Sequence, residues 1–408
     1  MFLYLKLAIR NLLRNKRRTF IAGSAIGIGL AALICTDALI LGMEENMIAS
    51  ATESFLGEGQ IHRRGFRESY EVDKTIVDPQ GILERLRNDK LVDRAAPRVI
   101  TYAMINSPAN LAAVSMIGID PEAERYLSQV DEALVEGEYF AGDDPHDIVI
   151  GQKLADILEV HLGSRVVMTA AQARSGDLSQ EMYRISGIFH FNIKEMDRAT
   201  VFVRLSQARK MLGLGDDIHE IALTLHDREP GLNSDDPFWG RYSDDENEAI
   251  SWSGLLPELK TALELSQFST FIIGLILFGV VALGIINTLF MSMHERQFEF
   301  GVLRAIGTRP FIMARLILFE AGALAALSII MGNITGLIVT YITSKTGIDY
   351  TGIEFSGVTF RELLYPILEV KQFIVYPLAV FIFTILIGLY PAFSAARLSP
   401  VKAMRRSL

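Results

Sequence analysis

The feature that most constrains this chain is the placement of four long apolar stretches, one near the N-terminus and three in the last third. They run from about residue 20 to 41, 268 to 293, 316 to 342 and 373 to 395. A helix of about 20 apolar residues crosses the roughly 30 Å hydrocarbon core of a membrane. About 220 residues of mixed polar sequence separate the first stretch from the second. The sequence therefore predicts a membrane protein with four transmembrane helices (1+3) and a large domain inserted after the first helix.

Basic residues flank these stretches on one side. Six precede the first stretch, four lie between the second and third, and four follow the last: Lys6, Arg10, Arg14, Lys16, Arg17 and Arg18; Arg296, Arg304, Arg309 and Arg315; and Arg397, Lys402, Arg405 and Arg406. Cytoplasmic loops of membrane proteins carry an excess of Lys and Arg. We therefore expect these segments in the cytoplasm and the large domain outside it.

The large domain is acidic. Residues 44–266 contain 40 Asp and Glu against 22 Lys and Arg, a net charge of −18, twice the −9 of the whole chain. This charge excludes nucleic acid as a partner and favours a domain that stays away from anionic lipid headgroups.

These patterns divide the chain into nine predicted segments. They are a cytoplasmic amphipathic helix (1–18), a first transmembrane helix (19–43), an extracytoplasmic α+β domain (44–266), a second transmembrane helix (267–293), a cytoplasmic loop with a short helix (294–315), a third transmembrane helix (316–342), a short extracytoplasmic loop (343–371), a fourth transmembrane helix (372–396) and a cytoplasmic tail (397–408).

The large domain alternates strand-like and helix-like runs. Runs rich in β-branched residues and bounded by Gly, Pro or Asp predict strands at 99–105, 112–119, 147–150, 165–169, 182–189, 200–203 and 220–225. Helical spacing predicts helices at 80–88, 151–158, 206–212 and 254–265, the last continuing into the second transmembrane helix. The acidic, proline-containing stretch 227–248 predicts a long loop outside the core.

Small and acidic residues stand out within the apolar stretches. Glycine pairs that would allow close helix approach are Gly23 and Gly27, Gly279 and Gly284, and Gly332 and Gly336. Glu320 is expected to bond within the bundle near its cytoplasmic end. For Asp37 two readings stay open, because the carboxylate could line a cavity or reach toward the membrane surface.

No catalytic or metal-binding constellation is present in the sequence. It lacks a phosphate-binding loop, H-E-x-x-H and C-x-x-C, and its seven histidines have no ligand spacing. The single cysteine, Cys35, lies in the first apolar stretch. We therefore expect a protein that is not an enzyme and holds neither a metal nor a cofactor, so that any nucleotide is bound by another chain.

The loop between the second and third stretches carries the strongest local pattern. Within residues 294–307, Phe300, Leu303 and Ile306 alternate with charges at helical spacing, Gly307 is placed to cap a helix, and Pro310 stops it. A short capped helix with exposed aliphatic residues suits docking into a groove of a partner. A turn lying on lipid headgroups would account for the basic residues but not for the acidic ones.

Several motifs carry a resemblance to a known family. Residues 299–307 with Glu320, and residues 390–397 with 400–403, resemble the FtsX-like permease domain of MacB-type (type VII) ABC transporters. Residues 116–121, 148–151 and 184–189 resemble the periplasmic region of the lipoprotein-releasing (Lol) permeases.

This resemblance implies a complex in the bacterial inner membrane, with the large domain in the periplasm. Two permease subunits, identical or different, would pair with a dimer of cytoplasmic ATPases that bind ATP and Mg²⁺. The short loop helix would sit on the ATPase and couple nucleotide-driven closure to the first and second helices. The coupling residues carried over from the motif are Glu295, Arg296, Glu299, Gly301, Leu303, Arg304, Ala305 and Gly307.

The resemblance also implies where cargo is held. In the lipoprotein-releasing branch, the acyl chains of the cargo enter a cavity between the first and second helices. The corresponding outer ends offer Leu39, Ile40, Met43, Met47, Phe268, Phe271, Ile272 and Leu275. Contact with membrane lipids would explain the same apolar residues.

A periplasmic lipoprotein carrier is a further partner that the resemblance suggests. In the branch that recruits one, a protruding hook makes the contact. The equivalent stretch, residues 170–181, offers Ala170, Ser175 and Leu178, but it has no proline or aromatic residue and so departs from the branch.

Lipoprotein release is accordingly the first functional hypothesis. A MacB-like efflux permease, or an FtsX-like transducer that activates a periplasmic partner, are the alternatives.

Overall fold

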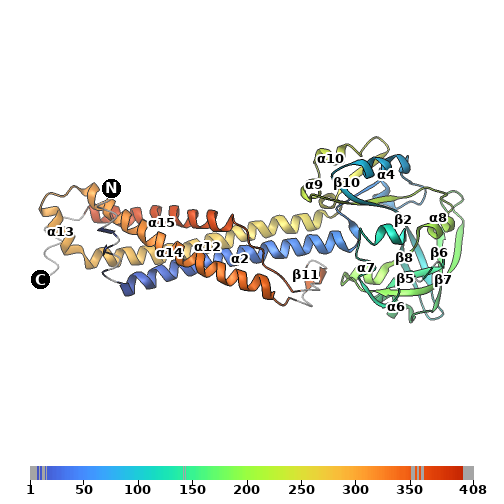
Figure 1. The fold of residues 1–408 in the computed structure, drawn as a ribbon, viewed down its shortest axis with the longest axis horizontal. Coiled ribbons are helices and arrows are strands. Elements are labelled where there is room, and N and C mark those ends of the chain that lie inside the picture. The colour runs from blue at the N-terminus through green and yellow to red at the C-terminus, as the bar shows by residue number, and fades with distance from the viewer. Residues whose placement is uncertain are drawn as a thin grey trace. The chain divides into compact units, whose positions relative to one another are not determined.

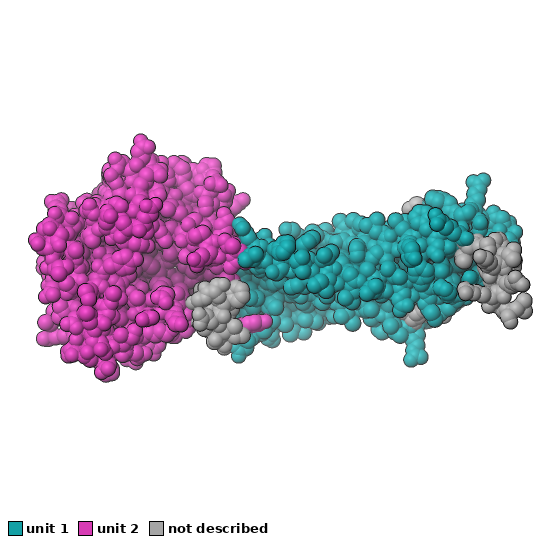
Figure 2. Space-filling model, turned by 180° about the vertical axis from the view of Figure 1, so that it is seen from behind, with its two compact units in different colours: residues 1–44, 263–349, 363–408 teal, residues 45–262, 350–362 magenta. Residues whose placement is uncertain are grey.

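The computed structural model describes residues 7–397 except 9, 12, 13, 15, 141, 143, 351–353, 356, 357 and 360–362. The chain forms two compact units, which Figure 2 shows in different colours. The helical unit comprises residues 1–44, 263–349 and 363–408, and the sheet unit comprises residues 45–262 and 350–362.

Four long helices build the helical unit and lie side by side in Figure 1. They are α2 (Lys16–Ala51), α12 (Pro257–Glu295), α14 (Pro310–Thr346) and α15 (Gln372–Ala396). Among the described residues, these are the four helices long and apolar enough to cross a membrane, as the sequence predicts. The 39 residues of α12 reach about 58 Å at 1.5 Å per residue, well beyond a membrane core. Both α2 and α12 contribute residues to both units.

Helix packing in the bundle follows from residues spaced one turn apart. Ile26, Leu30 and Ile34 on α2 are buried against residues of α12, α14 and α15. The backbones of α2 and α14 approach so closely that a Cβ on Gly332 would lie 2.8 Å from the carbonyl oxygen of Gly27. This contact confirms the packing expected for these glycines.

The other predicted glycine pair does not pack within this chain. A Cβ on Gly279 or Gly284 of α12 would meet no atom of the described residues within 4 Å. This face of α12 points away from the other helices of the chain, so the close helix approach expected for this pair stays a prediction.

A mixed sheet dominates the sheet unit. Its strands, within the described residues, are β1 (Gly59–Arg63), β2 (Val92–Asn106), β3 (Leu111–Ile119), β4 (Leu134–Gly137), β5 (Asp147–Gly151), β6 (Arg165–Ala171), β7 (Leu178–Phe189), β8 (Thr200–Arg204), β9 (Glu220–Leu225) and β10 (Asn247–Ser251). Their order is β10-β1-β9-β2-β3-β8-β5-β7-β4, with β6 paired to β2 and β7. Only β3–β8 and β5–β7 are parallel. All seven predicted strands are confirmed, and β1, β4 and β10 were missed.

Short helices cover the sheet and connect its strands. They are α3 (Phe66–Ser69), α4 (Pro79–Asn88), α5 (Pro121–Glu124), α6 (Gln152–Leu158), α7 (Lys194–Ala199), α8 (Leu205–Leu212), α9 (Glu229–Leu232), α10 (Pro237–Gly240) and α11 (Trp252–Leu255). A π-helical turn, η1 (Thr52–Leu56), follows α2 and leads into β1. The predicted helices at 80–88, 151–158 and 206–212 are confirmed as α4, α6 and α8.

The stretch 227–248 is not the loop outside the core that its acidity suggested. It contains α9, α10 and the start of β10, and Phe238, Trp239 and Tyr242 are buried in the main core of the sheet unit. The side chain of Asp236 caps α10 by accepting from the amide of Phe238. The aromatic residues decide the structure here because burying them outweighs the propensity of the acidic flanks.

Several helix boundaries differ from the predicted ones, and two segments are only partly described. Helix α2 (Lys16–Ala51) and helix α14 (Pro310–Thr346) extend beyond the predicted 19–43 and 316–342 at both ends. Helix α12 begins at Pro257, which confirms that the helix predicted at 254–265 continues into the second transmembrane helix. Most of the predicted helix 1–18, and the tail from residue 398 on, lie outside the described residues. Within the loop 343–371, a small hairpin pairs β11 (Glu354–Phe355) with β12 (Val358–Thr359).

Candidate functional site

A cavity of about 350 Å³ opens between three helices of the helical unit. Its lining comes from α2 (Leu33, Thr36, Asp37), α12 (Gln267, Thr270, Phe271, Ile273, Gly274, Leu275, Phe278) and α15 (Tyr376). The helices α2 and α12 run antiparallel, since Leu33 approaches Gly274 while Val281 approaches Gly29. Thr36 and Asp37 therefore lie at the level of Gln267 and Thr270.

Among the described residues that line this cavity, Asp37 is the only one with a charged side chain. One of its carboxylate oxygens accepts from the Tyr376 hydroxyl at 2.6 Å, and the other accepts from the side-chain amide of Gln372 at 2.9 Å. Next to it, the amide of Ile367 donates to the carbonyl of Ala38 at 2.9 Å. Asp37 thus lies on a cavity wall, as one of the two readings expected.

The cavity includes two of the eight predicted cargo residues, Phe271 and Leu275. Met47 instead lines a separate cavity of about 610 Å³ in the sheet unit, together with Phe55, Leu56, Ile193, Met196 and other residues. The remaining five are not in the lining of the helical cavity: Leu39, Ile40 and Met43 on α2, and Phe268 and Ile272 on α12.

The short helix α13 (Gln297–Ala305) lies at one end of the helix bundle (Figure 1). Arg296, directly before it, is nearly buried and donates to Glu320 of α14 at 3.0 Å. Ser292 of α12 also donates to Glu320, at 3.0 Å. This polar cluster fastens α13 to α12 and α14 and confirms the bonding role expected for Glu320.

Glu299 belongs to the same cluster. It accepts from Arg296 at 2.9 Å and from Arg14 at 3.1 Å. Burial would raise the pKa of Glu299, but hydrogen bonds and attraction from Arg296 and Arg14 hold it below its usual range. Two of the predicted coupling residues, Arg296 and Glu299, are therefore engaged in contacts within the chain.

The loop also presents apolar side chains at its surface. Phe298 is 50% exposed, Leu303 is 38% exposed and Ile306 is 77% exposed. Gly307 has φ +99° and ends the helix, where the amide of Thr308 donates to the carbonyl of Leu303 at 3.0 Å. This geometry confirms the predicted glycine cap. Of the other predicted coupling residues, Gly301 is buried, Ala305 is exposed, Arg304 bonds to the carbonyl of Thr308, and Glu295 also has a bonding partner in the chain.

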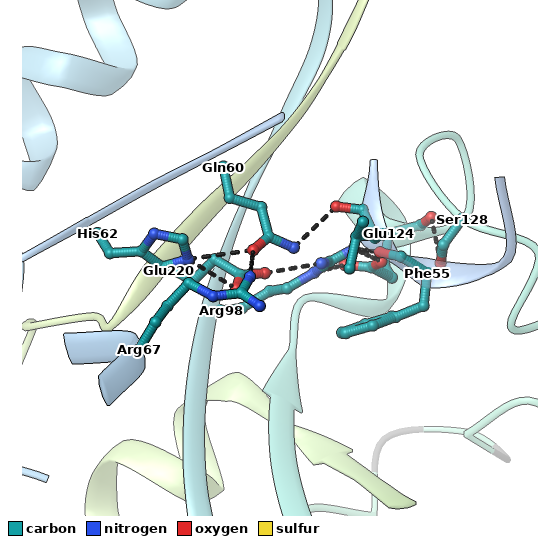
Figure 3. A network of polar contacts seen from close by, with 9 residues as sticks. Phe55, Gln60, His62, Arg67, Arg98, Glu124, Ser128 and Glu220 are labelled. Atoms are coloured by element: carbon teal, nitrogen blue, oxygen red, sulfur yellow. Dashed lines mark hydrogen bonds and ion pairs between the residues drawn. The ribbon is translucent and has the colours of Figure 1, made fainter. Parts of the chain in front are cut away.

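The sheet unit contains a buried charged network that the sequence analysis missed (Figure 3). Arg98 of β2 is fully buried and binds Glu124 through two nitrogens, at 3.0 and 2.5 Å. It also donates to Glu220 at 2.8 Å. Because Arg98 pairs with Glu220 in the β2–β9 register, the carboxylate lies beside it. The sequence offered one signal for this network. A charged residue stands at or directly before the start of two predicted strands, Arg98 before 99–105 and Glu220 at the start of 220–225.

The same arginine holds the turn that follows α2. Arg98 donates to the carbonyl oxygen of Phe55 at 2.6 Å, and its guanidinium carbon lies 3.7 Å from the centre of the Phe55 ring. His62 extends the network to Glu220 at 3.2 Å. Burial alone would raise the pKa of Glu220, but bonding and attraction from His62 and Arg98 hold it below its usual range. The network thus secures η1 to the sheet.

The predicted carrier contacts lie on the β6–β7 hairpin. Leu178 and Ser175 are exposed, and Ser175 donates to Gln172 within the turn. Ala170 is buried and does not present its side chain to a partner.

Comparison with known proteins finds two family models. The MacB-like periplasmic core domain matches residues 19–230, and the FtsX-like permease C-terminal domain matches residues 271–400. The first of these covers about half of the chain.

Individual relatives are distant but cover most of the chain. The lipoprotein-releasing system transmembrane protein LolC of Neisseria meningitidis is 22% identical over 82% of this chain and 84% of that protein. The transmembrane protein LolE of the same system in Haemophilus influenzae is 22% identical over 81% of this chain and 82% of that protein. Among solved structures, the periplasmic region of MacB from Actinobacillus actinomycetemcomitans aligns at a TM-score of 0.33 and 12% identity, covering 50% of this chain and 92% of that one.

Proposed function

The chain belongs to the family of ABC transporter permeases with a MacB-like periplasmic core domain and an FtsX-like C-terminal domain, and we propose that it extracts lipoproteins from the outer leaflet of a bacterial inner membrane. The family implies a cytoplasmic ATPase and a second permease subunit. Two of its relatives belong to lipoprotein-releasing systems by name. The observation that carries the proposal is the cavity between α2 and α12, which has a polar end and an apolar depth.

The cavity suits an acyl chain on physical grounds. Moving a methylene group from an apolar environment into water costs about 0.8 kcal/mol of free energy. A lipoprotein therefore leaves the bilayer only if apolar protein surface replaces the lipid around its chains. Phe271, Leu275 and Phe278 supply such surface along one helix.

Energy for extraction would enter through α13. Its exposed residues Leu303 and Ile306 would dock on the ATPase, while Arg296 and Glu320 tie the same helix to α12 and α14. A displacement of α13 on nucleotide binding would then move α12, which forms one wall of the cavity. The Arg98 network would carry movement of α2 into the sheet through η1.

A photo-reactive residue at Leu275 tests this function. Leu275 is 59% exposed and lines the cavity, whereas the adjacent Ile276 is 61% exposed and does not. We expect crosslinking at Leu275, but not at Ile276, to capture an acylated lipoprotein, and ATP to reduce the capture when the ATPase is present.

Other outcomes would favour the alternatives. Phospholipid alone at both positions would contradict lipoprotein release. Capture of a non-acylated periplasmic substrate at Leu275 would favour a MacB-like efflux permease. Binding of a periplasmic partner, with nothing captured in the cavity, would favour an FtsX-like transducer. A soluble lipoprotein carrier as a further partner would show as carrier-dependent release of the captured cargo.

A further inference from the structure

We propose that Asp37 makes the cavity selective for an amphiphile with a primary ammonium group, which the carboxylate binds while an acyl chain occupies the apolar depth. The inference rests on the proposed function. That function places an acyl chain in the cavity, and the inference assigns the polar head of the same molecule.

The polarity of the cavity changes along its length. Its polar residues Thr36, Asp37, Gln267 and Thr270 lie at one end, and Leu33, Leu275 and Phe278 lie farther along the helices. From Gln267 to Phe278 the lining of α12 extends about 16 Å at 1.5 Å per residue. An amphiphile has the same order of parts, with a polar head followed by an apolar chain.

The polar end lies where the helix bundle gives way to a loop. Helix α15 begins at Gln372, one of the residues that donates to Asp37. The loop before it reaches α2 at the neighbouring residue, where Ile367 donates to Ala38. The head of a bound amphiphile would therefore lie near the end of the membrane-spanning part, as lipid headgroups do.

Both observed partners of Asp37 are neutral. Tyr376 and Gln372 each donate one hydrogen bond, and each carboxylate oxygen has a further lone pair. Among the described residues, no Lys, Arg or His lies within 4 Å of the carboxylate. Lys371 shares with Asp37 a second cavity of about 120 Å³ but forms no ion pair with it. The Asp37 carboxylate thus forms no ion pair among the described residues.

A carboxylate on a membrane-spanning helix that forms no ion pair is costly and marks a candidate functional site. A ligand ammonium would relieve this cost by pairing with the charge, whereas an amide or hydroxyl would only add a neutral hydrogen bond. Hydrogen bonds to charged groups are worth about twice those between neutral groups, so the preference should be about tenfold or more.

Two kinds of molecule in a bacterial membrane carry acyl chains and a primary ammonium. One is a lipoprotein whose N-terminal cysteine has two acyl chains and a free α-amino group. The other is a phospholipid with an ethanolamine headgroup, which also brings a phosphate. Both share the chemistry that Asp37 would recognise, and the experiment separates them.

The test uses the full-length permease in nanodiscs of choline and glycerol phospholipids, with the photo-reactive residue at Leu275. The probes are a synthetic dipalmitoyl lipopeptide with a free α-amino group and the same lipopeptide with an N-acetyl group. This pair differs in charge but not in the number of long chains. We expect the wild type to capture the free-amino probe with at least about tenfold higher affinity, and Asp37→Asn to bind both probes equally.

Two controls keep the result interpretable. Asp37→Asn keeps the shape of the side chain and one acceptor oxygen, and its folding is checked by ATPase co-purification. Tyr376→Phe removes one donor to Asp37 but leaves the charge, so it should keep the preference.

Nanodiscs containing ethanolamine phospholipid supply the second arm of the experiment. Competition by that lipid, but not by choline lipid, would assign the ammonium to a membrane lipid.

The inference and the proposed function fail in different ways. If both lipopeptides are captured equally by the wild type, or if Asp37→Asn keeps the preference, the role of Asp37 is wrong while lipoprotein binding stands. If neither lipopeptide is captured at Leu275 in nanodiscs free of ethanolamine lipid, the proposed function itself fails.

Discussion

Arg98 and Glu124, both fully buried in the sheet unit, form a two-point ion pair at 3.0 and 2.5 Å. Glu220 completes the coordination of the guanidinium from the neighbouring strand at 2.8 Å. The fourth contact of the arginine goes to the backbone of Phe55, in the turn that follows α2. A buried charged group is therefore placed at the point where the chain passes from a membrane-spanning helix into the sheet.

Breaking this pair should destabilise the sheet unit strongly. Glu124→Gln leaves the buried Arg98 with one carboxylate fewer, and loss of one partner from a buried ion pair costs about 3–5 kcal/mol. Glu246→Gln is the matched control, because Glu246 pairs with Arg63 at the surface, where such pairs contribute about 0–1 kcal/mol. Thermal unfolding followed by tryptophan fluorescence measures both, since the two tryptophans of the chain, Trp239 and Trp252, are buried in this unit. Equal unfolding temperatures for the two variants would contradict the importance of the buried pair.

Acid should weaken the sheet unit, beginning with His219. The ring accepts at Nδ1 from the amide of Ile100 at 3.0 Å and donates from Nε2 to the carbonyl of Val72 at 2.8 Å, so a second proton would break the first bond. Burial lowers the pKa of His219 below its usual range. The unfolded chain therefore binds a proton first, and stability is lost as the pH falls below about 6.5.

A further loss should follow at lower pH from Glu220. Its pKa in the folded protein is held below its usual value, so its contribution is complete above about pH 4.3 and is lost as the pH falls through the folded value. Each group can change stability by up to about 1.4 kcal/mol per pH unit within its range. Tryptophan-detected unfolding between pH 7.5 and 5.5 separates this loss from that of Glu220, and comparison of variants assigns it to His219. The difference should shrink in His219→Asn and persist in His226→Asn, whose ring is exposed; an unchanged slope in the first variant would exclude His219 as the cause.

The sequence predicted those parts of the structure that depend on local composition. The four apolar helices follow from the length of their apolar runs, and strands such as β3 and β9 follow from β-branched residues bounded by turn residues. Strands β1 and β10 were missed because they are short and hold polar residues such as His62 and Asn247. These strands form because they pair with each other, a contact between residues almost 200 positions apart.

The candidate site was predictable only in part, for a related reason. Residues facing the cavity depend on how α2 and α12 are rotated against each other, so the sequence could place Leu275 near the site but could not separate it from Phe268. Similarly, the sequence around Arg296 predicts an exposed charge in a loop. Its burial depends on Glu320, which the fold brings beside it from another helix. The pairing of Arg98 with Glu124 and Glu220 requires the strand register, which local patterns do not contain.

Close packing of α2 on α14 should make Gly332 intolerant of a side chain. A Cβ there would lie 2.8 Å from the carbonyl oxygen of Gly27 and 2.9 Å from the Leu30 side chain, and backbone cannot move aside cheaply. Gly332→Val should therefore destabilise the bundle by about 1–3 kcal/mol. Gly279→Val is the matched control, because a Cβ at Gly279 meets nothing within 4 Å among the described residues. The loss of folded permease on heating in detergent compares the two variants, and equal losses would argue against the α2–α14 contact.

Docking on the ATPase should depend on the exposed apolar side of the α13 loop. Ile306 is largely exposed and makes no contribution to the buried cores, so Ile306→Asp changes the surface without disturbing the bundle. If this surface enters a groove of the ATPase, the new carboxylate would be buried without a partner, which costs enough to weaken binding about tenfold or more. Lys345→Asp, near the opposite end of α14, introduces the same side chain away from α13 and should leave binding intact. Co-purification of the ATPase and its stimulated ATP hydrolysis are the measurements.

Glu299→Lys is a less clean test of the same surface, because it would also break the ion pairs of Glu299 with Arg14 and Arg296 inside the chain. Full ATPase binding by Ile306→Asp, with tryptophan-detected unfolding unchanged, would exclude this side of the loop as the docking surface.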